Sequence, residues 1–446
     1  MSQAFDAAEQ QSRLEERATR ALALAAELGA DACEVGASVD QGIGVGVRLG
    51  ETESVELSRD QGIAVTVYVG QRKGNASSSD ASDASLRAVV EKAIAIAQHT
   101  GEDPAAGLAE AALMATELPD LDLHHPWALE TDDALALALR CEQAGRERAG
   151  ITNSEGASLS STEAVTVYAN SHGFLGSRRG TRHSLSCLLI AGSGEGMQRD
   201  HDFTTARRAS DLASPEQVGI SAAERTLRRL DARRPRTGRF PVLFAPEMAR
   251  GLVGNLLNSI AGGALYRESS FLCDQLGATL FPEWFSLGER PRERGGMASS
   301  AFDSDGVATR DNVFIDEGRL ASYMLSAYSA RRLGLQTTGN AGGARNVRIQ
   351  APTTELAALM RQMGTGVMVT EMMGQGLNPV TGDYSRGAAG FWIENGEISH
   401  PVEEFTVAGN LREMFAALQG VGDDIDRRGS VHTGSWLVDG MTLAGQ

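Results

Sequence analysis

Residues 363–410 read MGTGVMVTEMMGQGLNPVTGDYSRGAAGFWIENGEISHPVEEFTVAGN. Within them, Asn395 and Gly396 separate two runs in which apolar and polar residues alternate. Asn-Gly in this setting is a strong hairpin signal, because both central residues of a type I′ turn need a positive φ. The stretch therefore predicts two antiparallel strands joined by a tight turn, and it favours a mainly β structure for the end of the chain.

A glycine-rich segment precedes this hairpin. Gly382, Gly387 and Gly390 surround four consecutive residues with polar side chains, which are Asp383, Tyr384, Ser385 and Arg386. Because glycine allows the backbone to bend sharply, this pattern is typical of a binding loop rather than of a core element. The sequence therefore predicts a substrate-binding or partner-binding segment at residues 383–386.

Composition and charge narrow the class of protein. The chain has 446 residues, a length typical of about three domains, and 42% of its residues are hydrophobic. Its net charge of −17 repels nucleic-acid backbones and anionic membranes. We therefore expect a globular protein that binds neither nucleic acid nor a membrane.

The cysteines and the apolar runs indicate a cellular location. Four cysteines are scattered along the chain without a C-x-x-C pair, which is typical of reduced thiols in a long cytosolic protein. The apolar run at residues 21–26 is short and is surrounded by charges, so it does not resemble a secretory signal. No run approaches the ~18 apolar residues needed to span a membrane. These features predict a cytoplasmic protein.

Three segments follow one another along the chain, with expected boundaries at 1–118, 119–234 and 235–446. The first predicts a helix at about 4–28, ended by Gly29, and a second helix near 86–98 with Ser82 or Asp83 as its N-cap. Between the helices we expect short strands at 35–39, 44–49, 54–57 and 63–69, with turns at 40–42 and 60–62.

The second segment repeats this helix–strands–helix order. Helices are expected at about 132–148 and 215–230, with strands that include 164–169 and 184–191. The tetrapeptide Val-Thr-Val-Tyr occurs at both 65–68 and 165–168, but the shared layout is better evidence of a duplicated unit than this short match.

The third segment contains a helix at about 246–260 and reads mainly as β structure. The sequence thus predicts an α+β fold: two helix–strands–helix N-terminal domains followed by a mainly β, partly barrel-like C-terminal domain. Seven arginines at 225–239 join the second and third segments. They fit a solvated helix end better than a phosphate-binding patch.

The usual catalytic patterns are missing from the sequence. It contains neither H-E-x-x-H nor H-E-x-x-x-H, in which two imidazoles hold zinc while the glutamate activates a water. It also lacks a G-x-S-x-G nucleophile elbow. Arg345 and Asn346, which follow a glycine-rich run, form a candidate anion or peptide contact, and a purely structural loop explains them equally well.

Several motifs of the third segment resemble those of the TldD/PmbA metallopeptidase family, in its PmbA or TldE branch. They are SAYSAR at 326–331, GNAGGARN at 339–346, MGQG at 373–376, TGDYSRGAAGFWIENGEI at 381–398 and AGNL at 408–411. The resemblance implies three domains and a cytoplasmic zinc peptidase formed by one TldD-like and one TldE-like chain. The implied substrates are unfolded or extended peptides, including leader segments of modified peptides and an antitoxin.

The same resemblance implies that this chain is the non-catalytic partner. The catalytic branch carries H-E-x-x-x-H on a helix that matches residues 246–260, and a later cysteine completes its zinc site. Here the matching positions are Gly254, Asn255 and Ser259, and no cysteine follows Cys273. We therefore expect no catalytic residue and no metal in this chain, and zinc in its TldD-like partner.

Two other hypotheses stay open from the sequence. The chain could be an autonomous peptidase with an unrecognised site, or a regulatory binding protein of a toxin or gyrase system. The charge of −17 opposes direct DNA contact in the last case, although a protein target is compatible with it.

Overall fold

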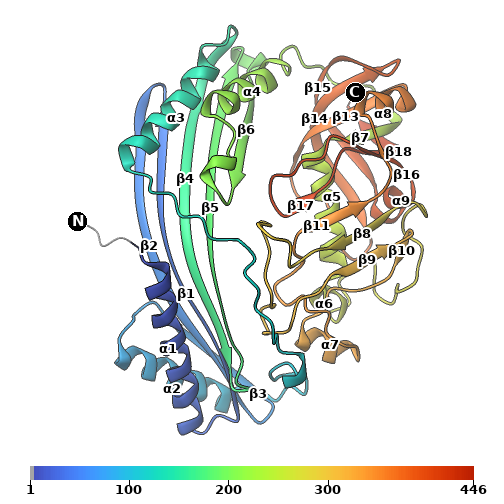
Figure 1. Cartoon of the computed structure of the whole chain (residues 1–446). Helices are drawn as coiled ribbons and strands as arrows, with labels where there is room; N and C mark the ends of the chain where they lie inside the picture. Colours follow the sequence, from blue (N-terminus) through green and yellow to red (C-terminus); the bar gives the residue numbers. More distant parts are fainter. Residues whose placement is uncertain (1–4, 446) are drawn as a thin grey trace.

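The computed structural model describes residues 5–445, and its N-terminal half is built on one six-stranded antiparallel sheet of order β3-β2-β1-β4-β5-β6 (Figure 1). The strands are β1 (Ala32–Arg48), β2 (Glu51–Val69), β3 (Arg72–Ser78), β4 (Ile151–Asn170), β5 (Leu175–Ala191) and β6 (Gln198–Ala206). β1 pairs with β4 from Glu34↔Asn170 to Val47↔Ala157, so the two predicted helix–strands–helix units share a single sheet.

The turns predicted at 40–42 and 60–62 are wrong. The chain runs through both segments as continuous strand, with Asp40 paired to Asp60 and Gly42 to Ser58. The real turn lies at Leu49 and Gly50, which both have positive φ. The first half of β2 is exposed on both faces, so its sequence lacks the apolar alternation that marks a half-buried strand.

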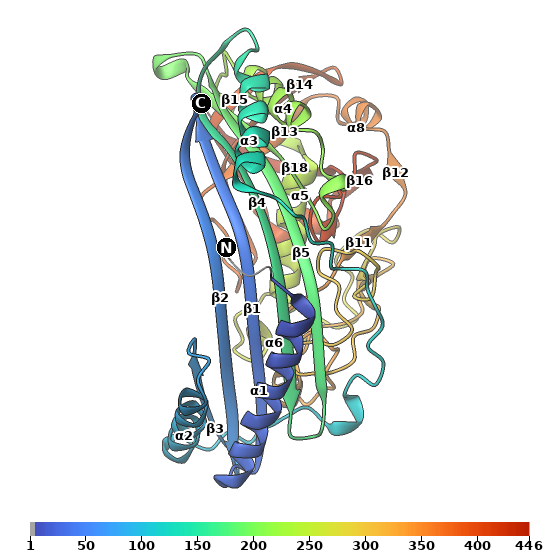
Figure 2. The same cartoon turned by 60° about the vertical axis from the view of Figure 1, so that its left-hand side comes forward.

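Four helices cover one face of this sheet (Figures 1 and 2). They are α1 (Ala7–Glu27), α2 (Asp83–His99), α3 (Thr131–Arg146) and α4 (Pro215–Leu227). All four predicted helices are confirmed, although Ala4, the predicted start of the first, lies outside the described residues. Ser82 is the N-cap of α2, since its hydroxyl accepts the Ser85 N–H.

The apolar residues of the sheet explain this one-sided cover. Odd-numbered residues of β1, β4 and β5, such as Val35, Val167 and Leu185, are buried under the helices. Even-numbered residues of the same strands point to the opposite face, because side chains alternate along a strand. That opposite face is turned toward the C-terminal half of the molecule (Figure 1).

The predicted repetition of layout is present in the structure. The order α1-β1-β2-β3-α2 is followed by α3-β4-β5-β6-α4, and the sheet order is symmetric about the β1–β4 pair. The tetrapeptides at 65–68 and 165–168 fall on β2 and β4, which are not equivalent strands of the two units. The sequence match is therefore unrelated to the structural repeat.

The C-terminal half is built around a closed barrel of five strands. The barrel strands are β7 (Gly238–Phe244), β13 (Gly366–Met373), β14 (Asp383–Glu394), β15 (Glu397–Asn410) and β18 (Trp436–Ala444), and pairing of β18 with β7 closes the barrel. Asn395 and Gly396 have φ of 53° and 80° and join β14 to β15, so the predicted hairpin is confirmed. The predicted α+β fold with a barrel-like C-terminal domain is also confirmed.

Smaller elements surround the barrel. β16 (Leu418–Gly422) and β12 (Thr353–Thr354) extend it beyond β18, while a second sheet has the order β10-β9-β8-β11-β17. The strands of that sheet are β8 (Ser286–Glu289), β9 (Asn312–Asp316), β10 (Arg319–Leu320), β11 (Val347–Gln350) and β17 (Val431–His432). The helices of this half are α5 (Pro246–Ser259), α6 (Gly262–Leu265), α7 (Ala327–Leu333), α8 (Leu356–Met363) and α9 (Leu411–Ala416). None of the helices within residues 5–445 combines the length and the apolar composition that a membrane-spanning helix needs.

Candidate functional site

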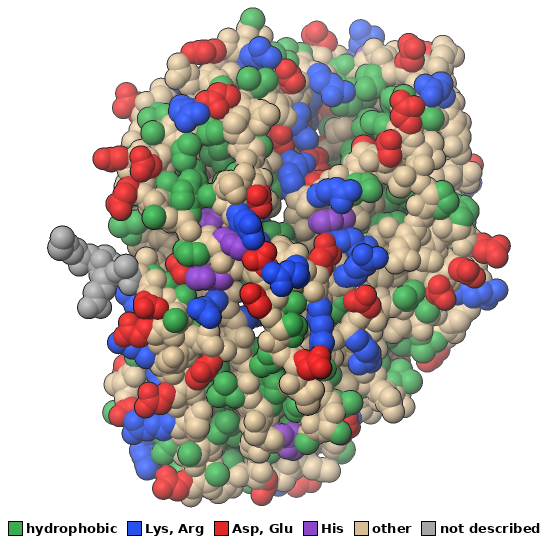
Figure 3. All heavy atoms as spheres, in the orientation of Figure 1, with side chains coloured by type: hydrophobic (Ala, Val, Ile, Leu, Met, Phe, Trp, Pro, Cys, Tyr) green, Lys and Arg blue, Asp and Glu red, His purple; other side chains and the backbone are tan. Residues whose placement is uncertain are grey.

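A cleft separates the helix-free side of the large sheet from the C-terminal half, and basic and His side chains gather along it (Figure 3); the basic residues that line its cavities are arginines. One cavity in this cleft has a volume of about 540 Å³. It is lined by Asp200, Arg225, Arg228, Ala245, Pro246, Glu247, Met368, Thr370, Phe391, Asp424, Ile425, Asp426, Arg427 and Arg428. β6, α4, the start of α5 and the barrel all contribute to it.

Arginines in the last turn of α4 and just after it connect the two halves of the molecule. Arg225 donates to both carboxylate oxygens of Glu247, at 3.1 and 2.9 Å, and Arg229 pairs with Glu371 of β13 at 2.5 Å. The interpretation of this run as a solvated helix end is therefore wrong for these two residues. Arg234 does pair at the surface, with Glu404. The helix end faces the barrel, which no local pattern in the sequence reveals.

Glu247 is the centre of this network. Besides the two bonds from Arg225, it accepts one from Arg428 at 2.7 Å. Burial acts to raise the pKa of Glu247, but the charges and hydrogen bonds of Arg225 and Arg428 outweigh it and hold that pKa below its ordinary value. Arg428 also pairs with Asp202 of β6 and with Asp426, so three chain segments meet here.

The sequence gives no indication of this network. Glu247 lies in the first turn of α5, where a carboxylate favours the start of the helix, and nothing in its local sequence marks it as a link between domains. The partners lie 22 and 181 residues away in the chain, so spacing gives no signal for them.

The positions that we expect to correspond to the zinc motif of the catalytic branch, Gly254, Asn255 and Ser259, lie on α5. A Cβ added to Gly254 would meet no atom within 4 Å, so this position has space but no ligand. Ser259 is 2% exposed, and its hydroxyl donates to the Asn255 carbonyl oxygen at 2.8 Å. Throughout residues 5–445, no group of three or more His, Cys, Asp or Glu side chains is arranged to hold a metal. These residues do not fit a zinc ion.

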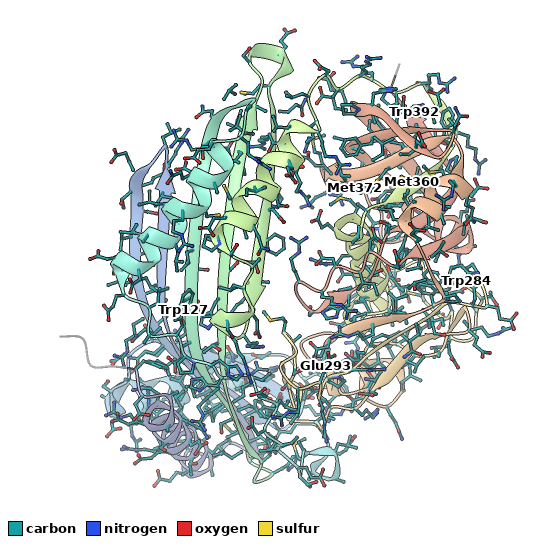
Figure 4. The ribbon with its side chains drawn as sticks, turned by 45° about the horizontal axis from the view of Figure 1, so that its top comes forward. Trp127, Trp284, Glu293, Met360, Met372 and Trp392 are labelled. Atoms are coloured by element: carbon teal, nitrogen blue, oxygen red, sulfur yellow. The ribbon has the colours of Figure 1, made fainter. Side chains whose placement is uncertain are left out.

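Residues 383–386 lie at the start of β14, so the prediction that they form a loop is wrong. Asp383 is exposed and accepts hydrogen bonds from Thr381 Oγ1 and Asn410 Nδ2, which lower its pKa. Tyr384 is 2% exposed and donates to the sulfur of Met372 at 3.1 Å; Met372 is labelled in Figure 4. Ser385 is exposed and Arg386 is half-buried.

Strand alternation explains these positions, because consecutive side chains point to opposite sides of the barrel wall. The residue of β14 that lines the 540 Å³ cavity is Phe391 rather than any of 383–386. A binding role for those four residues stays a prediction.

Arg345 and Asn346 are both buried, at 8% and 0% exposure. Asn346 donates from Nδ2 to Ser299 Oγ and the Arg290 carbonyl, and its Oδ1 accepts the Ala298 N–H. These bonds give it a structural role in the loop. Arg345 donates to backbone carbonyls of its own loop and also lines a second cavity in the cleft, together with four other arginines.

Comparison with known proteins agrees with this architecture along the whole chain. Residues 33–97 match PmbA/TldA metallopeptidase domain 1, residues 124–230 the PmbA/TldA metallopeptidase central domain, and residues 237–445 the PmbA/TldA metallopeptidase C-terminal domain. Metalloprotease PmbA of Escherichia coli O157:H7 is 47% identical over 438 residues, which cover 98% of this chain and 97% of that protein. The Metalloprotease PmbA homolog of Haemophilus influenzae is 44% identical over 98% and 97% of the two chains.

Solved structures share the fold. A putative modulator of DNA gyrase from Bacteroides thetaiotaomicron superposes with a TM-score of 0.92 at 25% identity, covering 97% of this chain and 99% of the other. TldE from Thermococcus kodakarensis has the same fold, with a TM-score of 0.84 at 19% identity and coverage of 96% and 100%. By its three domain matches and its full-length relatives, the chain belongs to the PmbA/TldD metallopeptidase family, in the PmbA or TldE branch.

Proposed function

We propose that this chain is the non-catalytic subunit of a cytoplasmic two-chain zinc metallopeptidase. A TldD-like partner supplies the zinc and the general base, and the pair degrades or processes unfolded or leader peptides. The observation that carries the proposal is the chemistry of α5, where Gly254, Asn255 and Ser259 replace the two ligands and the base.

Each replacement removes a necessary step. A catalytic zinc needs about three protein ligands and an open position for water, and glycine offers no ligand atom. An asparagine amide cannot take the proton of that water, as a glutamate would. The Ser259 hydroxyl is committed to a backbone carbonyl inside the protein. Metal-dependent cleavage therefore requires side chains from another polypeptide.

The cleft gives this chain a way to hold a peptide. β6 is the last strand of the six-stranded sheet. Its Asp200 lines the 540 Å³ cavity, and its Thr205 and Ala206 line a neighbouring cavity of about 350 Å³. An extended peptide can add to such a sheet edge through main-chain hydrogen bonds, which do not depend on the peptide's sequence. This mode suits unfolded or leader peptides.

Co-expression with a TldD-like chain tests the proposal. We expect a heterodimer on size-exclusion chromatography, stoichiometric zinc, and cleavage of an unfolded peptide, whereas the purified chain alone has neither zinc nor activity. Stoichiometric zinc and cleavage by the chain alone would instead identify an autonomous peptidase. Repeated capture of a toxin-system protein or of gyrase, with no TldD-like protein, would instead support a regulatory binding protein.

A further inference from the structure

The second cavity of the cleft is lined by arginines. It has a volume of about 420 Å³ and lies between the helix-free face of β4 and β5 and two loops of the C-terminal half. Its lining includes Arg178, Arg179, Arg182, Arg207 and Arg345, together with several threonines and serines. Among the residues that the structure describes, no Asp or Glu contributes to this lining.

The floor of the cavity is made by three cross-strand pairs. They are Thr162↔Arg182, Ala164↔Gly180 and Thr166↔Arg178. The small central pair leaves room between the two flanking arginines, both of which have exposed side chains. Gly180 also permits the close approach of Arg207, whose Nη1 would lie 3.0 Å from a Cβ at this position.

The positive charge of this cavity is not compensated as it is elsewhere in the cleft. In the 540 Å³ cavity, Arg225 and Arg428 pair with carboxylates. By contrast, none of the five arginines of the second cavity has a carboxylate oxygen within 4.0 Å anywhere in residues 5–445. The nearest acidic influence on Arg345 comes from the buried Asp303 and Glu289.

Arg207 likewise carries a positive charge that no carboxylate side chain among the residues in the structure offsets. Its guanidinium donates to the carbonyls of Thr181 and Met297, while its buried Nε has no partner within the described part of the chain. Burial, followed by the positive charges of Arg178 and Arg182, lowers the pKa of Arg207. A bound anion would relieve this repulsion.

We propose that the arginine-lined cavity binds carboxylate side chains of an acidic segment in the peptide substrate, an inference that rests on the proposed peptide-holding function. Guanidinium groups bind carboxylates in bidentate fashion and with high geometric specificity. The cavity shares Arg207 and Met297 with the 350 Å³ cavity, which Thr205 and Ala206 of β6 also line, so the two cavities adjoin near the end of that strand and a peptide added to it would lie next to the arginines. The net charge of −17 disfavours a nucleic acid as the anion.

The test uses the full chain and two fluorescently labelled extended peptides, one with a run of Glu and one with Gln at the same positions. We expect the acidic peptide to bind the unmodified chain more tightly by about tenfold, and raising the salt from ~0.05 to ~0.2 M to reduce the difference. Replacing Arg178→Gln and Arg182→Gln together should remove the preference and leave the Gln peptide's affinity unchanged.

A charge-matched control is the double variant Arg59→Gln and Arg361→Gln, which removes two exposed arginines on β2 and α8. It should keep the preference, and circular dichroism should show that both double variants are folded. The inference would be overturned, with peptide holding left intact, if the unmodified chain bound the two peptides equally well. It would also be overturned if the control variant reduced the preference for the acidic peptide as much as the Arg178→Gln and Arg182→Gln variant does. If neither peptide binds, alone or with the TldD-like partner, the proposed function and the inference both fail. Competition by inorganic phosphate without a preference for the acidic peptide would also overturn the inference, since it would identify a phosphate site.

Discussion

The substitution Glu247→Gln tests whether the ion-pair network holds the two halves of the molecule together. Glu247 lies on α5 of the C-terminal half, and Arg225 lies on α4 of the N-terminal half. Their side chains are 21% and 27% exposed, so water screens the pair only in part. Gln has nearly the same shape as Glu, and the change therefore removes charge without creating a cavity.

The expected loss follows from the hydrogen bonds. Glu247 accepts two bonds from Arg225 and one from Arg428. Gln keeps one acceptor oxygen, so at best the two bonds to one oxygen are weakened, and the bond to the other is lost because an amide nitrogen cannot accept it. Charged hydrogen bonds contribute about 1.5–3 kcal/mol each and neutral ones about 1 kcal/mol, so these changes together cost about 3 kcal/mol. Arg225 and Arg428 keep Asp200, Asp202 and Asp426 as neighbours, which offsets part of this loss. We expect a decrease of about 2 kcal/mol in the free energy of unfolding.

Urea unfolding followed by circular dichroism at pH 7 measures this loss. The matched control is Glu404→Gln, which breaks another contact between the halves, since Glu404 pairs with Arg234. Those side chains are 64% and 55% exposed, so the control should cost at most about 1 kcal/mol. Equal effects of the two substitutions would contradict this prediction, because they would show that burial does not strengthen the Glu247 network.

Further predictions concern pH and two other buried residues. The folded protein holds the pKa of Glu247 below its ordinary value of about 4.3, so the ionised carboxylate stabilises the fold fully above that pH, and this stabilisation is lost as the pH falls through the lower pKa. The difference in urea unfolding midpoint between the unmodified chain and Glu247→Gln should therefore shrink on acidification. A difference that stays constant with pH would contradict this prediction. Burial raises the pKa of Tyr384 to about 12, so its hydroxyl is neutral at pH 7. In urea unfolding, Tyr384→Phe should lower the free energy of unfolding by less than about 1 kcal/mol, and Tyr384→Ala by about 3–5 kcal/mol. A large effect of Tyr384→Phe on peptide binding by the complex would instead show that the hydroxyl has a binding role. Asn346 has a φ of 45° and three side-chain hydrogen bonds. In thermal unfolding, Asn346→Ala should destabilise the chain by about 3 kcal/mol, and Asn346→Gly by about 1 kcal/mol less because glycine accepts a positive φ without strain. Equal losses for the two variants would show that the positive φ carries no strain.

Much of the fold could be predicted because its signals are local. Asn395-Gly396 selects its turn through the φ values that these residues accept, and Ser82 caps α2 through a bond to a residue three positions away. The helix order and the mainly β C-terminal domain follow from periodicity. By contrast, the continuity of β1 and β2 through residues 40–42 and 60–62 was not predictable. These polar segments are extended because they pair with each other as neighbouring strands, and their local sequence carries no strand signal.

Residue types along the chain are enough to identify the family, and they carry the expectation that Gly254, Asn255 and Ser259 do not form a zinc site, since ligand chemistry depends on residue type. The three-dimensional arrangement was needed to see that Tyr384 is buried in the barrel wall, that Glu247 joins the two halves, and that arginines from β5 and a distant loop share one cavity. The physical reason is that burial and charge pairing depend on which distant segments come together. Arg178 and Arg345 acquire their joint chemistry only when the sheet faces the C-terminal half.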